Sequence, residues 1–246
     1  MPTETKIEVC ANSLRSALIA QECGAHRIEL CTSLNEGGLT PSAGLIVQAR
    51  KNLNIPIHAL IRPRGGDFSY TSEEISEMME DIQFMKEVGI DGIVIGALDK
   101  VGNIDFELCR ILVEIAGPMD LTFHRAFDMC RDPFTALMRI KNLGFNRILT
   151  SGQANKAIDG IDLIKELIEN TDDKISIMPG SGINAENIKH FIDAGAKEIH
   201  VSASSILESK MTFRREDINM GGVANYPEFE KRLTDPDKLK AILKAI

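Results

Sequence analysis

Short hydrophobic runs of strand type alternate with amphipathic helical stretches along the whole chain. This alternation is typical of a parallel sheet whose strands are joined by crossover helices. The runs predict strands at Lys6–Ala11, Arg27–Cys31, Pro56–Arg62, Gly92–Leu98, Leu121–His124, Arg147–Ser151, Lys174–Met178 and Glu198–Ser202. A count of eight favours a closed barrel over an open doubly wound sheet, and no glycine fingerprint for a dinucleotide follows the first strand. We therefore predict an α/β protein with a single (β/α)8 TIM-barrel domain over residues 1–246.

The segments between these strands contain helix-start and helix-end signals. One helix is predicted from Ser72 to just before Gly89, and another after the capping pair Asp132-Pro133. No shift in composition indicates a domain boundary. Residues 203–232 are the longest stretch without a periodic pattern, so we expect an irregular segment after the eighth strand. Such a segment is either a lid, an oligomer contact or a plain connecting loop.

Alternation along each strand separates the side chains that face the helices from those that face the barrel interior. The apolar set must face the helices. The opposite set, which we place inside, is polar: Glu8, Cys10, Arg27, Glu29, Cys31, His58, Arg62, Thr122, His124, Thr150, Ser176, Glu198, His200 and Ser202. Barrel interiors are ordinarily filled by Val, Ile and Leu, and buried charges must be paired. The interior is therefore either a self-contained ion network, with Glu8 and Glu29 against Arg27 and Arg62, or a binding site at the C-terminal strand ends.

Two groups of residues are candidates for binding an anion. Arg62 and Arg64 stand in the loop after the third strand, and guanidinium groups bind carboxylate or phosphate in a bidentate manner. The alternative for Arg64 is a salt bridge to Asp67 within the loop. The second group is the turn Gly180-Ser181-Gly182, where free N–H groups precede a helix, together with Ser202 at the end of the eighth strand. Its alternative is a tight turn that needs glycine.

His124 ends the fifth strand, the position at which these barrels place catalytic side chains. A histidine there suits general acid–base chemistry, and Glu8 or Glu29 are further candidates for moving protons. A hydrogen-bonded core histidine explains His124 equally well.

The cysteines indicate a different chemistry. Glu8-Val-Cys10 and Glu29-Leu-Cys31 are expected in the same register on adjacent strands, which places Cys10 and Cys31 about 5 Å apart. Two soft thiolates at that separation suit Cu(I). A closed zinc site would need two more ligands. Geometry alone favours two buried free thiols that act as small hydrophobic groups.

Composition narrows the cellular setting. A formal net charge of -8 argues against a general nucleic-acid binder. No segment is apolar enough to span a bilayer, and the first residues have no apolar region of a secretory signal. Five cysteines without close spacing fit reduced thiols better than disulfides. We expect a cytoplasmic protein.

Taken together, these motifs resemble the CutC family of copper homeostasis proteins. The segments that carry the resemblance are Glu8–Cys10, Arg27–Cys31, Glu36–Ser42, Ile61–Phe68, Phe123–Asp128, Leu149–Gly152 and Met178–Ile183. The resemblance implies a cytoplasmic barrel that self-associates, usually as a dimer, with a higher assembly also open. It further implies a copper-binding role with Cys10 and Cys31 as the ligands.

Two functional hypotheses follow. The first is a Cu(I)-binding protein that uses Cys10 and Cys31 and performs no turnover. The second is an enzyme for a small anionic, phosphorylated metabolite, in which arginines orient the anion and Glu8, Glu29 or His124 move protons. A purely structural oligomer would explain neither the arginines nor the inward-facing acids.

Overall fold

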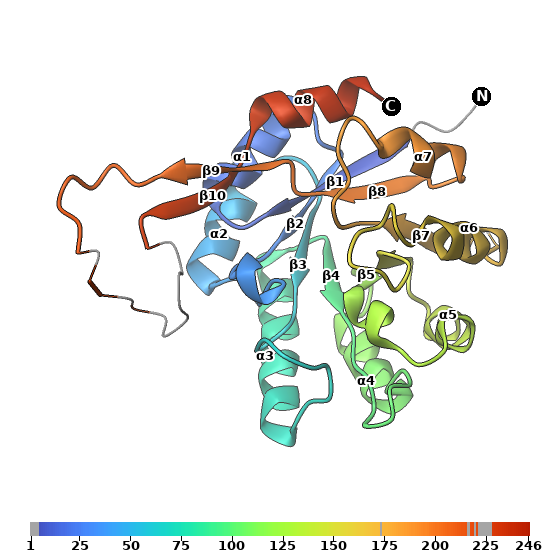
Figure 1. Ribbon diagram of the computed structural model, residues 1–246. Helices are drawn as coiled ribbons and strands as arrows, with labels where there is room; N and C mark the ends of the chain where they lie inside the picture. Colours follow the sequence, from blue (N-terminus) through green and yellow to red (C-terminus); the bar gives the residue numbers. More distant parts are fainter. Residues whose placement is uncertain (1–4, 173, 216, 219, 221–227) are drawn as a thin grey trace.

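Eight parallel strands form the centre of the protein (Figure 1), whose computed structural model describes residues 5–172, 174–215, 217–218, 220 and 228–246. The strands of this ring are β1 (Lys6–Ala11), β2 (Arg27–Leu30), β3 (Ile57–Leu60), β4 (Gly92–Ile95), β5 (Asp120–Phe123), β6 (Arg147–Thr150), β7 (Ser176–Pro179) and β8 (Glu198–Val201). The helices are α1 (Leu14–Cys23), α2 (Ala43–Asn52), α3 (Ser72–Val88), α4 (Phe106–Ala116), α5 (Pro133–Asn142), α6 (Ile161–Glu169), α7 (Ile188–Asp193) and α8 (Pro236–Lys244). Two 3-10 turns are η1 (Leu34–Glu36) and η2 (Arg125–Met129).

The strands are ordered around the ring as the chain is. Parallel ladders join them in the order β7-β6-β5-β4-β3-β2-β1-β8. Among the described residues, β7 and β8 pack side by side without a ladder, so the barrel is nearly closed. The predicted (β/α)8 barrel is confirmed, and most strands are one to three residues shorter than the hydrophobic runs indicated.

Local signals in the sequence fix the helix ends. Thr71 and Glu74 form a reciprocal capping box at the start of α3, and Gly89 ends this helix at a φ of +79°. Asp132 caps α5 and Pro133 is its first residue, as predicted. No helix within the described residues is both long enough and apolar enough to cross a membrane.

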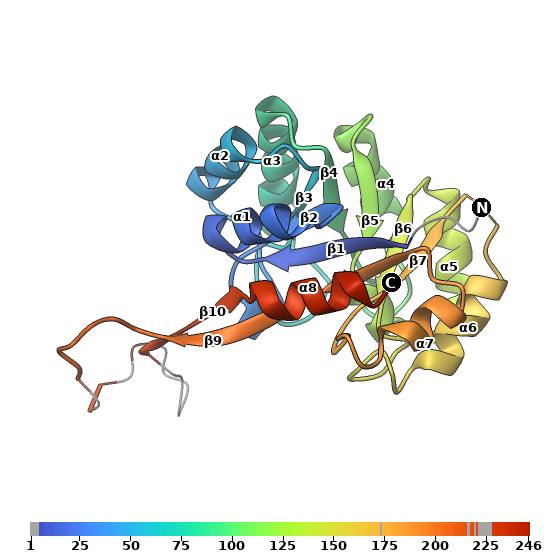
Figure 2. The same ribbon diagram turned by 90° about the horizontal axis from the view of Figure 1, so that it is seen from above.

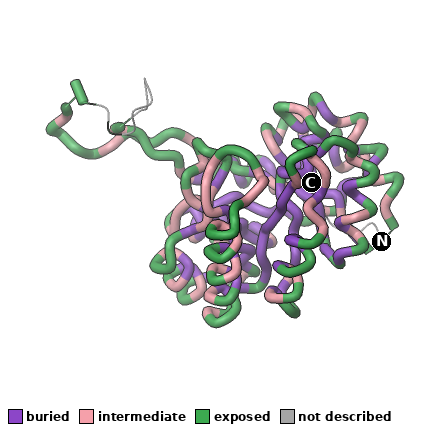
Figure 3. Tube along the Cα trace, turned by 90° about the horizontal axis from the view of Figure 1, so that it is seen from below, coloured by how far each residue is buried: buried purple, intermediate pink, exposed green. Residues whose placement is uncertain are grey.

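The main core lies between the ring and the helices. Every apolar strand side chain expected to face the helices belongs to it: Ile7, Val9, Ile28, Leu30, Ile57, Ile61, Ile93, Ile95, Leu121, Phe123, Ile175, Ile177, Ile199 and Val201. Figure 3 shows the buried strands enclosed by helices whose outer faces are exposed. Since one face of each strand is thereby used for packing, the other face is left to line the barrel interior.

A two-stranded arm projects from the barrel after β8 (Figures 1 and 2). It consists of β9 (Ser204–Glu208) and β10 (Glu230–Thr234), which pair in antiparallel fashion from Ser204↔Thr234 to Glu208↔Glu230. The segment expected to be irregular over residues 203–232 is therefore partly a β-ladder. The ladder was missed because β9 follows β8 after a bend at Ala203, whose φ is +43°, and because β10 is rich in charged residues.

Candidate functional site

A cavity of about 930 Å³ opens at the C-terminal ends of the strands. Side chains of β1, β2, β3, β6 and β8 form its floor, and the loops after β2 to β5 form its walls. The lining residues are Cys10, Glu29, Glu36, Gly37, Leu60, Arg62, Gly66, Asp67, Phe68, Ser69, Leu98, Asp99, Lys100, Gly102, His124, Arg125, Asp128, Met129, Leu149 and His200. This is the end of the barrel at which proteins of this fold place their functional sites.

Cys10 and Cys31 meet at the floor of the cavity, with Sγ atoms 3.6 Å apart. The expected proximity is confirmed, but the expected register is wrong. Cys10 pairs with Glu29 in the ladder, and Cys31 lies two residues further along the chain, directly after the end of β2. The two side chains therefore approach each other diagonally. Cys31 is fully buried, whereas Cys10 is 9% exposed and lines the cavity.

Polar groups surround the thiol of Cys10. The hydrogen bond with Cys31 and burial raise the pKa of Cys10 well above its ordinary value, and a hydrogen bond with His200 opposes this shift. Burial also raises the pKa of the Glu29 carboxyl, against the attraction of His200. Donor atoms of Cys10, Glu29 and Cys31 all lie within 4.8 Å of one another. The set comprises two sulfur donors and one oxygen donor, a combination that can hold a soft metal ion.

His200 connects the thiol to the interior of the barrel. Its Nδ1 lies 2.8 Å from Oε1 of Glu8, and its Nε2 lies 3.9 Å from Oε2 of Glu29. Burial lowers the pKa of His200, but the carboxylates and Cys10 outweigh it, so the net pKa is raised well above the ordinary value. For Glu8, burial raises the pKa, yet Arg27 and His200 bring it well below the ordinary value. We therefore assign a carboxylate to Glu8 and an imidazolium to His200 near neutral pH.

An ion network fills the barrel below this pair. Arg27 donates to Glu8 (2.5 Å) and to Glu198 (2.7 Å). Arg147 donates to Glu198 (3.2 Å) and to Asp120 (3.1 Å). The self-contained network that the sequence suggested is thus present, but with different members. Glu198, Arg147 and Asp120 belong to it, whereas Arg62 does not.

The sixth strand was interpreted wrongly. Arg147 and Leu149 face inward, whereas Thr150, which was assigned to the interior, donates to Oδ1 of Asp128 (2.5 Å) outside it. Ile148 and Leu149 are equally apolar and lie on opposite faces, so only Arg147 could have indicated which face of β6 points into the barrel.

Arg62 and Arg64, the two predicted anion ligands of the third loop, lie in different environments. Arg62 is buried, lines the cavity and donates to the carbonyl oxygens of Glu36 (2.6 Å), Gly38 (2.9 Å) and Gly66 (2.9 Å). Arg64 lies outside the cavity, where Nε donates to Glu74 (2.5 Å) and Nη2 to Asp67 (3.1 Å). The salt bridge considered for Arg64 and Asp67 is present. Of the two predicted arginines, Arg62 alone lines the cavity and can meet a ligand there.

His124 also lines the cavity and is 4% exposed. Its Nδ1 accepts a hydrogen bond from the backbone N–H of Ala126 (3.1 Å). Burial and the nearby charge of Arg62 lower the pKa of His124 to about 3, so the ring is neutral at physiological pH. Of the two other residues suggested for proton transfer, Glu29 lines the cavity while Glu8 lies beneath it.

The turn Gly180-Ser181-Gly182 is not part of the described cavity lining, and neither is Ser202. Ser181 has a φ of +88°, and its hydroxyl donates to the carbonyl oxygen of Asn155 (2.8 Å). A Cβ on Gly182 would meet the side chain of Lys156 at 3.3 Å. The turn is thus packed against the loop after β6, and it is separate from the arginines of the third loop.

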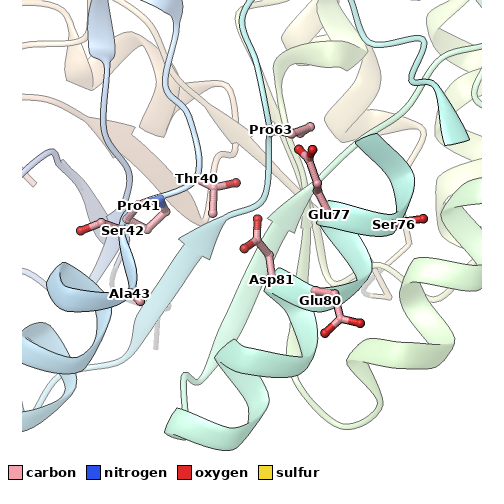
Figure 4. A pocket seen from close by; sticks show the side chains of 9 residues that line it. All are labelled: Thr40, Pro41, Ser42, Ala43, Pro63, Ser76, Glu77, Glu80 and Asp81. Carbon is pink, nitrogen blue, oxygen red and sulfur yellow. The ribbon is translucent and has the colours of Figure 1, made fainter. Parts of the chain in front are cut away.

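A second pocket, of about 590 Å³, lies outside the barrel between the start of α2 and α3 (Figure 4). Glu77, Glu80 and Asp81 of α3 line it opposite Thr40 and Ser42. Burial raises the pKa of Asp81, although a hydrogen bond with Thr40 opposes the shift. The predicted site residues all lie elsewhere.

The fold and this cavity define a single-domain (β/α)8 barrel with a thiol pair at the floor of its C-terminal opening. The model of the CutC family matches residues 5–205. A family protein CutC of Parabacteroides distasonis is 50% identical over 239 residues, which cover 96% of this chain and 98% of that protein. A human copper homeostasis protein cutC homolog is 45% identical over 237 residues, covering 96% and 87% respectively.

A crystal structure of the Streptococcus agalactiae CutC protein matches the fold with a TM-score of 0.77 at 35% identity, covering 80% of this chain and 98% of that one. The chain belongs to the CutC family. The resemblance inferred from the motifs is thereby confirmed, and the family is one of copper homeostasis.

Proposed function

We propose that this protein binds Cu(I) through the thiolates of Cys10 and Cys31. The observation that carries the proposal is the 3.6 Å separation of the two sulfur atoms at the floor of a solvent-connected cavity. Soft thiolates favour Cu(I) over hard cations such as Mg²⁺ and Ca²⁺. The names of the relatives, which refer to copper homeostasis, support the same assignment.

The spacing favours a bent site with a third donor. With metal–thiolate bonds of about 2.3 Å, a linear two-coordinate ion would need sulfur atoms about 4.6 Å apart. At 3.6 Å the two sulfurs are closer than that. Glu29, whose carboxyl lies within reach of both thiols, is an additional donor, and His200 adjoins Cys10. A Cu(I) titration of the wild type beside the Cys10→Ser/Cys31→Ser variant tests the assignment.

A second candidate function, turnover of a small anionic molecule, is favoured by the environment of Glu29. Its carboxyl lines the cavity with a raised pKa beside a protonated His200, an arrangement that suits a general acid or base. In this function Glu29 exchanges a proton with the ligand, Glu8 holds His200, and His124 donates a hydrogen bond. Mass spectrometry of small molecules extracted from cells and incubated with wild type or Glu29→Gln tests it, since only the wild type should deplete one of them.

We further propose that the protein forms a homodimer or a higher homo-oligomer through the β9–β10 arm. Ile206 and Leu207 of β9 are 57% and 50% exposed, and Phe213 beyond it is 71% exposed. Exposed apolar side chains clustered on a projecting arm are typical of a contact surface.

A cytoplasmic location, the last part of this proposal, is supported by the five free cysteines, because such thiols persist in a reducing compartment.

A further inference from the structure

Two buried N–H donors of the cavity lining make no hydrogen bond within the described part of the chain. They are Nε of Arg62 and Nε2 of His124. The two residues are 5% and 4% exposed, so both donors have also lost most of their access to bulk water. An unsatisfied buried donor costs about 1–3 kcal/mol, more when it carries charge. Buried donors of this kind are explained when a ligand accepts from them.

The guanidinium of Arg62 is a buried positive charge without an acidic partner. Its Nη1 and Nη2 atoms donate to backbone carbonyl oxygens only, and no carboxylate among the described residues forms an ion pair with it. These bonds hold the guanidinium rigidly, and it also stacks on the ring of Phe68 at 5.0 Å. Its Nε is the one donor atom of this guanidinium that makes no hydrogen bond within the described part of the chain. Since an unpaired buried cation is unfavourable, the ligand that completes this site is an anion.

The hydrogen-bonding pattern of His124 fixes which nitrogen carries its proton. Nδ1 accepts from the Ala126 N–H, so the hydrogen of the neutral ring is on Nε2. The ring packs against Phe68, with ring centroids 5.1 Å apart. It also fills the space beside Gly96, where a Cβ would lie 2.7 Å from two ring atoms. His124 is therefore a rigid neutral donor that flanks the same phenyl ring as Arg62.

The remaining lining limits the charge and shape of the anion. Five acidic residues line the cavity: Glu29, Glu36, Asp67, Asp99 and Asp128. These acids outnumber the basic lining residues Arg62, Lys100, Arg125 and His200 by only one, which still disfavours a phosphate dianion. The Gly180–Gly182 turn that was expected to bind phosphate does not line the cavity. The apolar side chains of Leu60, Phe68, Leu98, Met129 and Leu149 line it as well. A single negative charge on a small apolar body fits this combination.

We propose that the cavity binds a small organic monocarboxylate, whose oxygens accept hydrogen bonds from Nε–H of Arg62 and Nε2–H of His124 while its apolar part contacts Phe68. This inference names a ligand class for the second candidate function. It rests on that function only because both use the same cavity. It replaces the phosphorylated metabolite expected from the sequence. It does not depend on copper binding, because neither donor contacts the two cysteines.

The test is a ligand-observed NMR titration of the full chain with butyrate, benzoate and phenylacetate. Benzamide serves as the uncharged control and phenyl phosphate as the dianionic one. Three variants are compared with the wild type. Arg62→Lys keeps the charge and removes Nε–H together with the Nη donors. His124→Phe keeps an aromatic ring and removes Nε2–H. Arg64→Lys changes an arginine of the same loop that does not itself line the cavity. Thermal unfolding of each variant establishes that it is folded.

We expect saturable binding of at least one carboxylate, with benzamide and phenyl phosphate binding more weakly. Arg62→Lys and His124→Phe should each weaken it by about ten-fold or more, as expected for lost charge-assisted or buried hydrogen bonds. Arg64→Lys should bind the carboxylate like the wild type. The proposal is overturned if no carboxylate binds saturably, if phenyl phosphate binds more tightly, or if folded Arg62→Lys and His124→Phe bind normally. Because copper binding is tested with the cysteine variant and carboxylate binding with Arg62→Lys and His124→Phe, failure of this proposal is separable from failure of the copper assignment.

Discussion

Oε1 of Glu8 lies 2.8 Å from Nδ1 of His200, and this contact joins the ion network of the barrel to the thiol of Cys10. The other oxygen of Glu8 accepts from Arg27 at 2.5 Å. One buried carboxylate thus holds two cationic groups in place. The carboxylate of Glu8 therefore belongs to the ion network and also orients His200 beside the thiol of Cys10.

Glu8→Gln should destabilise the protein strongly. The substitution leaves the charges of Arg27 and His200 buried with fewer partners, and breaking a buried ion pair costs about 3–5 kcal/mol. Urea unfolding measures the free energy of unfolding of this variant. The matched control is Glu107→Gln, which alters the exposed contact with Arg110 and should cost no more than about 1 kcal/mol. A loss below about 1 kcal/mol for Glu8→Gln would show that the network does not stabilise the fold.

Stability should fall as the pH is lowered below about 6.5. Burial lowers the pKa of His58 to about 4 and that of His124 to about 3, so both rings are neutral in the folded state while the unfolded chain takes up protons. Each histidine then removes about 1.4 kcal/mol of stability per pH unit, from the unfolded pKa of about 6.5 down to its own folded pKa. His200 has a raised pKa, so its contribution is fully present in this range and is lost only as the pH rises through its folded pKa.

The measurement is urea unfolding at several pH values between 7.5 and 4.5. In His124→Phe the pH dependence should be shallower by the contribution of one histidine. A wild-type stability that stays constant between pH 7 and pH 5 would contradict the assignment of neutral buried rings.

Copper affinity should increase with pH. Cu(I) binds the thiolates, and the hydrogen bond with Cys31 together with burial raises the pKa of Cys10 well above its ordinary value. Binding must therefore release protons near neutral pH. Competition titrations with a chromophoric Cu(I) chelator at pH 6.5, 7.5 and 8.5 should give successively smaller dissociation constants. Affinity that does not change with pH would show that the ligands are not these protonated thiols.

If the proposed oligomer forms through the arm, replacing Ile206 and Leu207 by serine should give a monomer without unfolding the barrel, because both side chains are on the projecting arm. Light scattering coupled to size-exclusion chromatography measures the mass. Val101→Ser is the control, since Val101 is 63% exposed in the loop after β4, far from the arm in the sequence. If the double variant keeps the mass of the wild type, the arm is not the subunit contact.

The sequence predicts this barrel well because one face of every ring strand except β6 is uninterruptedly apolar. Ile7 and Val9 on β1 illustrate this, since they can only pack against helices while Glu8 and Cys10 must face inward. The same alternation identifies Glu29, Arg62, His124 and His200, which all line the cavity.

Partners that come from distant segments could not be predicted in this way. Arg62 and Arg64 are two residues apart on one loop, so the residue pattern does not distinguish them. Only the fold shows that Glu74 at the start of α3 binds Arg64, whereas Arg62 lines the cavity. The shift that makes Cys10 the neighbour of Glu29 depends on the strand stagger of the barrel, which the residue pattern does not contain. Arg147 was missed because strand β6 has apolar residues on both faces.

The most direct test of the copper assignment is an anaerobic Cu(I) titration under reducing conditions. Wild type is compared with Cys10→Ser/Cys31→Ser and with Cys23→Ser, which removes a thiol of α1 remote from the cavity. The account predicts one tight equivalent in the wild type and in Cys23→Ser, and none in the double variant. A wild type without a tight site, or a double variant that still binds one equivalent, would contradict the assignment of Cys10 and Cys31 as copper ligands.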